Sequence, residues 1–83
     1  MNQKTILLNH VASLDMTELG YGRAWVLQGI GGDLYIEVPW LEPVEGCMLA
    51  EGRTIFPAEY LKQCGDIHAA MLVERVESEI PAT

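Results

Sequence analysis

Residues 23–38 constrain the fold of this chain more than any other stretch, because they read as two strands joined by a glycine-rich turn. The second run, Leu34–Val38, alternates apolar residues with Tyr35 and Glu37, which is the period of a strand with one buried face. The first run, Arg23–Gln28, is apolar at its centre. Between them lies Gly29-Ile30-Gly31-Gly32-Asp33, whose glycines tolerate positive φ. Together these features predict an antiparallel hairpin.

Short apolar segments on either side of the hairpin predict further strands. Thr5–Ala12 is rich in β-branched and apolar residues, and we expect it to form the first strand. Cys47–Ala50 and Thr54–Phe56 read as two more, separated by a turn at Glu51–Arg53. Pro39 should end the second hairpin strand, because proline cannot donate a ladder hydrogen bond.

Two single helical turns are expected beside these strands. In Ser13–Leu19, either Ser13 or Asp15 could cap a turn that Gly20 would end with a left-handed residue, and a plain loop is the alternative. Farther along, Pro57 suits the start of a turn over residues 58–63, which Gly65 would end.

The C-terminal segment favours a helix. Its apolar residues follow the spacing of one helix face, the opposite face is mixed, and Asp66 precedes the segment as a cap. The apolar positions are Ala69, Leu72, Val73, Val76 and Ile80. We therefore predict an α+β fold, with an antiparallel sheet of four or five short strands and a C-terminal helix. The alternative is a small all-β barrel, in which residues 68–77 form a last strand.

One stretch resembles a known family. From Gly52 to Leu61 a glycine turn, a strand ending in Phe56-Pro57, a helical turn and a Tyr60-Leu61 pair follow one another, as in the last third of an SH3 domain. The resemblance covers about ten of the 83 residues and lacks that family's opening motif and paired tryptophans. It implies a barrel-like sheet, and it would place Pro57 and Tyr60 in a groove for proline-rich peptides.

The size of the chain limits what it can bury. Its 83 residues make one small acidic domain, 1–83, yet 49% of them are hydrophobic and only 20% are charged. A domain this short buries roughly 60–65% of its unfolded surface. Some apolar side chains must therefore lie at the surface, which favours a homo-oligomer or a protein partner.

The net charge limits the classes of partner that the chain can bind. Twelve acidic and five basic residues give a net charge of −7, which repels phosphate backbones and anionic lipid. We therefore expect no direct nucleic-acid binding and no membrane association. The first residues include only the short apolar run Ile6–Leu8, too short for a secretory leader, so the expected location is cytoplasmic. In that reducing compartment Cys47 and Cys64 should be free thiols, and a Cys47–Cys64 disulfide is the alternative.

Residues that could support metal binding or catalysis are few. His10, Cys47, Cys64 and His68 equal the ligand count of one zinc site, but no Cys-x-x-Cys or His-x₃-His pair is present. Cys64 and His68 are four residues apart, and Gly65-Asp66 would interrupt a helix that could align them. Cys64, Asp66 and His68 contain the groups of a nucleophile–base pair without a surrounding signature. We predict no cofactor, no metal and no enzyme activity.

A binding site is predicted around Trp40. Trp40 lies in a proline-bounded loop near acidic residues, so an apolar side chain is surrounded by negative charge. Aromatic residues are enriched at interface hot spots. Trp25 and Phe56 are instead assigned to the core. The predicted partner-binding residues are Trp40, Tyr35, Tyr60, Glu37, Glu42 and Glu45.

Three functions are consistent with the sequence. The first is a small acidic protein-interaction module, homo-oligomeric and acting by binding, as an accessory or inhibitor protein of the kind that phages and mobile elements encode. The second is an acidic mimic that blocks the basic groove of a nucleic-acid-binding protein. The third is a small enzyme or ligand binder with its site at an oligomer interface, which requires a hollow containing His10 or His68.

Overall fold

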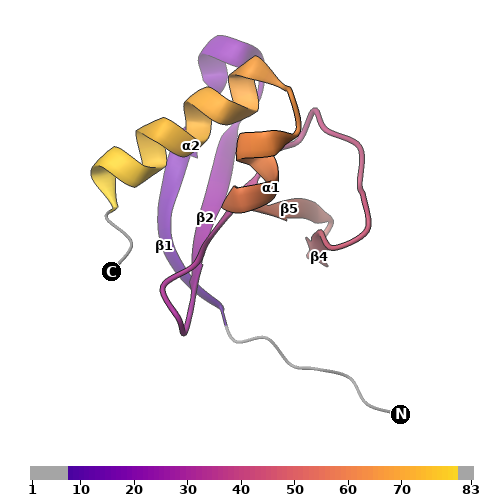
Figure 1. Ribbon diagram of the computed structural model, residues 1–83. Coiled ribbons are helices and arrows are strands. Elements are labelled where there is room, and N and C mark those ends of the chain that lie inside the picture. Colours follow the sequence, from indigo (N-terminus) through magenta and orange to yellow (C-terminus); the bar gives the residue numbers. More distant parts are fainter. Residues whose placement is uncertain (1–7, 81–83) are drawn as a thin grey trace.

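The computed structural model describes residues 8–80 and shows an open five-stranded antiparallel sheet with two helices packed on one face (Figure 1). The strand order is β1-β2-β3-β5-β4, so β1 and β4 are the two edges and the sheet does not close into a barrel. The predicted α+β fold is confirmed, and the all-β alternative is wrong. The strands are β1 Leu8–Asp15, β2 Arg23–Gly29, β3 Leu34–Glu37, β4 Met48–Ala50 and β5 Arg53–Pro57. The helical elements are the 3-10 turn η1 Thr17–Leu19, α1 Ala58–Gln63 and α2 Ile67–Glu79.

The predicted hairpin is formed by β2 and β3. Leu27 pairs with Tyr35, and the backbone N–H of Gly29 donates to the carbonyl of Asp33 at 2.8 Å across the turn. Gly32 has φ +94°, the left-handed conformation that only glycine adopts without strain. The expected alternation also holds, because Leu34 and Ile36 are buried in the core.

The first strand differs from its prediction. Residues Thr5–Leu7 lie outside the described residues, and β1 continues past Ala12 to Asp15. Ser13, expected near a helix cap, instead pairs with Trp25 of β2. Pairing with a long partner strand overrides the local turn preference of serine, since each added ladder residue satisfies backbone hydrogen bonds.

Asp15 stabilises the start of the short turn after β1, although Met16 occupies the N-cap position. Its carboxylate accepts hydrogen bonds from the Thr17 backbone N–H at 3.0 Å and from the Thr17 hydroxyl at 2.8 Å. Gly20 ends the turn with φ +88°, as the sequence predicted.

The elements between residues 47 and 63 confirm their predictions to within a residue. Glu51 and Gly52 both have positive φ, at +52° and +79°, and make the tight turn between β4 and β5. Pro57 has an extended backbone, with φ −61° and ψ +140°. It is the last residue of β5, and α1 begins at the next residue. Gly65, with φ +89°, then separates α1 from α2.

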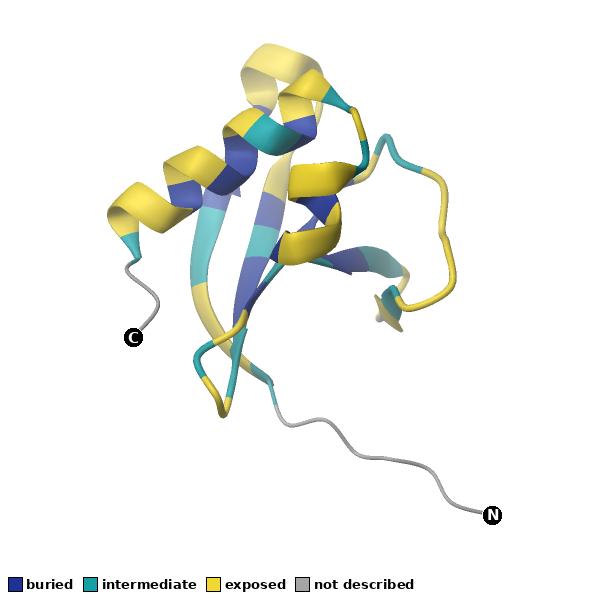
Figure 2. Ribbon diagram, in the orientation of Figure 1, coloured by how far each residue is buried: buried dark blue, intermediate teal, exposed yellow. Residues whose placement is uncertain are grey.

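The C-terminal helix is confirmed as α2. Asp66 caps it, because its side chain accepts a hydrogen bond from the Ala69 backbone N–H at 2.9 Å. Figure 2 shows buried residues along the side of α2 that faces the sheet and exposed residues on the opposite side. Those buried residues are Ala69, Leu72, Val73 and Val76.

The core lies between the sheet and the two helices. Phe56 is fully buried there, as predicted. Trp25 was also assigned to the core, and this assignment is wrong. It is half-buried on the other side of the sheet, because it occupies the opposite phase of β2 from the core residue Val26.

Candidate functional site

The six residues predicted to bind a partner do not form one site. Tyr35 and Glu37 belong to β3 and alternate with the core residues of that strand, so they lie on the sheet face turned away from the helices. Tyr60 lies on α1, where its ring stacks on Phe56 with centroids 5.6 Å apart. Two of the six, Glu42 and Glu45, are exposed in the loop that follows Trp40.

Trp40 is at the centre of an aromatic cluster. Its ring lies 5.6 Å from Tyr21 and 6.4 Å from His68, measured between centroids, and the contact with His68 is edge-on. The indole N–H donates to the carboxylate of Asp66 at 3.3 Å. Trp40 is half-buried and also packs against the core, so the cluster is fixed in place by the fold.

Two adjoining surface hollows begin at this cluster. The first has a volume of about 240 Å³ and the second about 260 Å³, and both are lined by Leu19 and His68. Together they run from the aromatic cluster, between η1 and the first turns of α2, to Met71 and Arg75. We name them the Trp40–Met71 groove.

The groove is apolar inside and acidic at its border. Its exposed apolar side chains are Leu19, Tyr21 and Met71, of which Met71 exposes 60% of its surface. The charged lining consists of Asp15, Glu18 and Asp66, with Arg75 as the single arginine or lysine among the described lining residues. Arg75 has an acidic neighbour of its own, because its Nε lies 3.6 Å from Glu79.

Asp15 keeps its charge in this border. The backbone N–H and the hydroxyl of Thr17 both donate to its carboxylate and hold the pKa of Asp15 below its usual value. The carboxylate is fully exposed and stays ionised at neutral pH. The groove therefore presents a negative border around an apolar floor.

Of the six predicted binding residues, only Trp40 lines the groove. The predicted border residues Glu37, Glu42 and Glu45 do not line the groove, whereas Asp15, Glu18 and Asp66 do. One signal was present in the sequence, since Met71 falls on the face of the C-terminal helix opposite its core residues. The remaining contacts join residues far apart in the chain, and only the packing of α2 beside η1 brings them together.

Glu37 takes part in a different arrangement, on the outer face of the sheet. Its Oε1 accepts hydrogen bonds from Arg53 at 2.7 Å and from the backbone N–H of Trp25 at 2.9 Å. The guanidinium carbon of Arg53 lies 4.3 Å from the ring centroid of Trp25. Although Glu37 was predicted to be a solvated binding residue, it is buried and its charge is neutralised by Arg53.

Both histidines line surface hollows. His68 borders the Trp40–Met71 groove, and His10 borders a separate hollow on the outer sheet face. The Ser13 hydroxyl lies 3.3 Å from His10 Nε2, but within residues 8–80 no acid hydrogen-bonds the other ring nitrogen to complete a catalytic triad.

Within residues 8–80, no group of three or more potential metal ligands occurs. Both cysteine thiols are unpaired.

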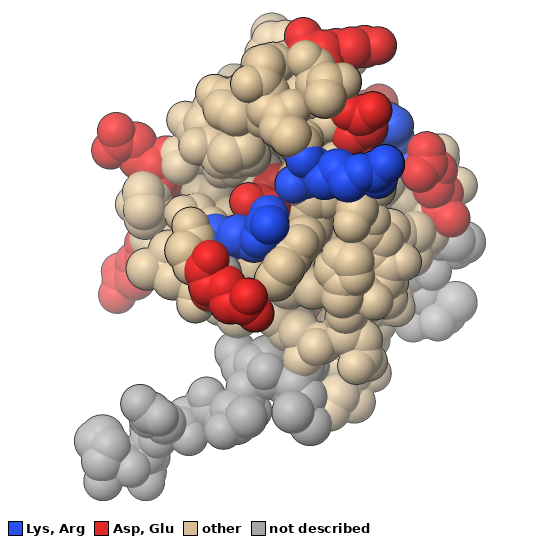
Figure 3. All heavy atoms as spheres, turned by 180° about the vertical axis from the view of Figure 1, so that it is seen from behind, with Lys and Arg blue, Asp and Glu red and all other residues tan. Residues whose placement is uncertain are grey.

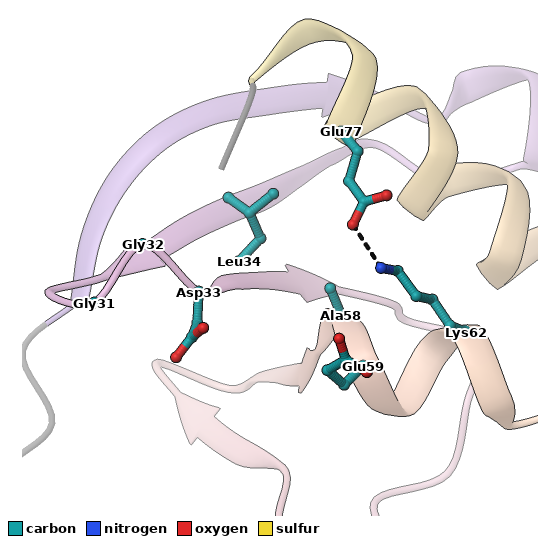
Figure 4. Close-up of a pocket in the computed structure, with 8 residues that line it drawn as sticks. All are labelled: Gly31, Gly32, Asp33, Leu34, Ala58, Glu59, Lys62 and Glu77. Atoms are coloured by element: carbon teal, nitrogen blue, oxygen red, sulfur yellow. Dashed lines mark ion pairs between the residues drawn. The ribbon is translucent and has the colours of Figure 1, made fainter. Parts of the chain in front are cut away.

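A further hollow, of about 220 Å³, lies between the hairpin turn and the two helices (Figure 4). Lys62 on α1 and Glu77 on α2 meet across it, with Nζ and Oε2 2.8 Å apart. This hydrogen bond, and then the charge of Glu77, raise the pKa of Lys62 above its usual value. Because the lysine is already paired, we assign this contact to joining the helices.

None of the helices in residues 8–80 combines the length and the apolar character needed to cross a membrane. Comparison with known proteins adds no relative: no family model, no curated protein and no solved structure matches this chain. The function must therefore be argued from the geometry of the chain itself.

Proposed function

We propose that this chain is a small cytosolic protein-interaction module that acts by binding, and that its partner-binding site is the Trp40–Met71 groove. The observation that supports the proposal is the pairing of exposed apolar side chains with an acidic border in one groove. Rigid aromatic anchors provide most of the binding energy at many interfaces, and Trp40 is held rigidly by Asp66, Tyr21 and His68.

The chemistry of the groove selects a partner segment that is both apolar and basic. Leu19 and Met71 would contact its apolar side chains, and methionine adapts to differently shaped partners. Asp15 and Glu18 would attract Lys or Arg at its edges. An amphipathic basic helix meets both requirements. The proposal also includes self-association, because the apolar fraction is high for a chain of 83 residues.

Met71→Glu tests this function. The probe is a synthetic amphipathic leucine–lysine helix, titrated into the full chain by isothermal calorimetry. We expect the substitution to weaken binding about tenfold, which corresponds to about 1.4 kcal/mol, because it places a charge on the apolar floor. The matched control is Ile30→Glu, which adds the same charge at an exposed isoleucine on the hairpin turn, outside the groove.

This substitution also separates the proposed function from nucleic-acid mimicry. A mimic binds through negative charge, so an added glutamate at position 71 would leave its affinity for a basic surface unchanged or increase it. Equal affinities of the wild type, Met71→Glu and Ile30→Glu for the leucine–lysine helix would contradict the groove as the binding site.

A further inference from the structure

One end of the Trp40–Met71 groove is built from aromatic rings and a carboxylate. Tyr21, Trp40 and His68 line the hollow of about 240 Å³ at this end, together with Leu19 and Asp66, and we name it the aromatic hollow. The Trp40 ring is inclined by 37° to the Tyr21 ring and by 86° to the His68 ring, so the rings do not form one flat stack. Sites for drug-sized ligands usually have about 300–1,000 Å³, so this hollow suits the end of a side chain.

The aromatic hollow favours a positively charged group. The face of an aromatic ring carries partial negative charge, which attracts a cation within about 6 Å of the ring centre. Asp66 adds a formal negative charge to the lining, and Asp15 and Glu18 line the adjoining hollow. Among the described residues that line the aromatic hollow there is no lysine or arginine.

The other tryptophan shows the same interaction with a cation of the chain itself. The guanidinium carbon of Arg53 lies 4.3 Å from the ring centroid of Trp25, on the outer face of the sheet. Figure 3 shows this side of the molecule, with Lys and Arg atoms across its upper part. In the part of the chain that the structure describes, no such side chain lies over Trp40. A cation for Trp40 would therefore come from a partner.

The hydrogen-bond acceptors at the aromatic hollow distinguish between cations. The N–H groups of an ordinary lysine or arginine need acceptors when they leave water. Both carboxylate oxygens of Asp66 already accept hydrogen bonds, Oδ1 from the Ala69 N–H at 2.9 Å and Oδ2 from the Trp40 indole at 3.3 Å. The other described lining residues contribute only the Tyr21 hydroxyl and a His68 ring nitrogen as side-chain acceptors. A quaternary ammonium has no N–H group, so it gains the attraction of the rings without an unsatisfied donor.

The position of the aromatic hollow within the groove indicates the source of this ammonium. Leu19 and His68 line both hollows, so the aromatic hollow adjoins the part of the groove that would hold a partner segment. The methylene chain of a lysine could lie along Leu19. A choline headgroup carries a phosphate beside its ammonium, which Asp15 and Glu18 would repel. Arg75 lies toward the other end of the groove and would repel a cation there.

We propose that the aromatic hollow binds the quaternary ammonium group of a trimethylated lysine in the partner segment. The inference rests on the proposed function, because it concerns one end of the same groove. It adds a modified residue as the recognised feature. It also gives the bound segment an orientation, with its cationic end at Trp40 and its apolar part toward Met71.

The test compares three versions of the leucine–lysine helix, titrated into the full chain by isothermal calorimetry. At one end, each end being tested in turn, they carry trimethyllysine, unmodified lysine, or a neutral side chain of the trimethyllysine shape in which carbon replaces the ammonium nitrogen. We expect the trimethyllysine helix to bind about fivefold more tightly than either of the others, because only its side chain is a cation without N–H donors. If the trimethyllysine helix bound no more tightly than either of the others, the inference would be overturned.

Protein variants locate the site. Tyr21→Leu keeps an apolar side chain and removes one ring, so it should reduce the preference for trimethyllysine over lysine to less than about twofold. Tyr60→Leu is the matched control and should keep the preference, since Tyr60 is exposed to a similar extent, 36% against 39%, but lies on α1 outside the groove. Circular dichroism must show that both variants keep the fold. A preference that Tyr21→Leu leaves unchanged would contradict the aromatic hollow as the site.

Asp66→Asn separates the charge of the hollow from its shape. Asparagine caps helices as well as aspartate does, so the start of α2 should be retained. We expect this variant to bind the trimethyllysine helix more weakly than the wild type does, and to bind the neutral version with unchanged affinity, because only the cation is attracted by the carboxylate. An equal loss for both versions would indicate a change of structure and count against the inference.

Small molecules distinguish the sources of a quaternary ammonium. Nα-acetyl-trimethyllysine amide should shift the indole N–H resonance of Trp40, assigned in a Trp25→Phe background, and tetramethylammonium chloride should shift the same resonance. Phosphocholine should bind more weakly than the amide, because its phosphate meets the acidic border of the groove. Binding of phosphocholine as tight as that of the amide would overturn the peptide source.

The inference and the proposed function can fail separately. If the helix binds and Met71→Glu weakens it, but trimethyllysine brings no gain, the inference fails and the proposed function stands. If no version of the helix binds, both fail.

Discussion

At the scale of single residues, Glu37 is the side chain whose environment differs most from its expected one. It stands in the polar phase of an alternating strand, yet it is 8% exposed. The reason is local: Arg53 and the Trp25 backbone N–H both donate to one of its oxygens, and Arg53 in turn lies over the Trp25 ring. A carboxylate that is paired and hydrogen-bonded in this way can be buried without a large penalty.

Replacing Glu37 should therefore destabilise the fold. We expect Glu37→Ala to lower the free energy of unfolding by about 1–3 kcal/mol, because it leaves the partly buried Trp25 N–H and the Arg53 guanidinium without their acceptor. Glu37→Gln should lose less, since its amide oxygen can still accept from Trp25. Urea denaturation measures both values. Glu45→Ala, at an exposed loop residue, is the control and should stay within about 0.5 kcal/mol of the wild type.

The ionisation of Asp15 should make the free energy of unfolding depend on pH in the acidic range. Thr17 lowers the pKa of Asp15 in the folded chain below its ordinary value of 3.8. The stabilisation that this provides is fully present above that value and is lost as the pH falls through the folded-state pKa. We expect the stability difference between wild type and Asp15→Asn to shrink as the pH is lowered from neutral to about 3, because asparagine does not titrate. A difference that is constant with pH in urea denaturation would contradict this assignment.

At the scale of elements, α2 links the core to the candidate site. Its buried face packs on the sheet. Its N-cap residue Asp66 and the first-turn residue His68 both contact Trp40. One carboxylate serves two purposes, since Asp66 Oδ1 caps the helix at Ala69 and Oδ2 accepts from the Trp40 indole. The start of the helix and the position of Trp40 are therefore coupled.

Substitution of Asp66 should reveal this coupling. We expect Asp66→Ala to cost about 0.5–2 kcal/mol of stability through loss of the cap, and Asp66→Asn to cost much less, because asparagine caps helices well. Asp66→Ala should also move the Trp40 fluorescence, measured in a Trp25→Phe background so that only one tryptophan emits. A stability loss in Asp66→Ala without any change in fluorescence would show that the Asp66–Trp40 contact does not position the ring.

At the scale of the whole molecule, the sheet separates two surfaces with different chemistry. On the helix side, the groove between η1 and α2 is apolar with an acidic border. On the other side, the curved sheet face is apolar with two arginines nearby. A small domain cannot enclose all of its apolar residues. Here some of the exposed ones line these hollows, whereas others, such as Ile30 and Ile67, lie outside them. The two hollows therefore lie on opposite sides of the sheet.

The elements could be predicted from the sequence because their signals are local. The hairpin depends on alternation and on the glycines of its turn, the last helix on its apolar spacing and on Asp66, and the β4–β5 turn on Gly52. The end of the first strand was misjudged, because Ser13 has a turn preference that pairing with Trp25 overrides. The SH3-like stretch gave the correct order of strand, proline and helical turn, but not a closed barrel.

The candidate site was predictable only in part. Trp40 was identified from its type and its loop, whereas Tyr21, His68 and Met71 became its neighbours through packing. The sequence by itself determined the acidic charge, the excess of apolar residues, and where most strands and helices lie, because these depend on composition or on residues a few positions apart. Tertiary structure alone decided that Glu37 is buried against Arg53 and that Trp25 lies outside the core. It also decided which acidic residues lie near Trp40. Those outcomes depend on strand order, sheet curvature and helix docking, which bring together residues that are distant in the chain.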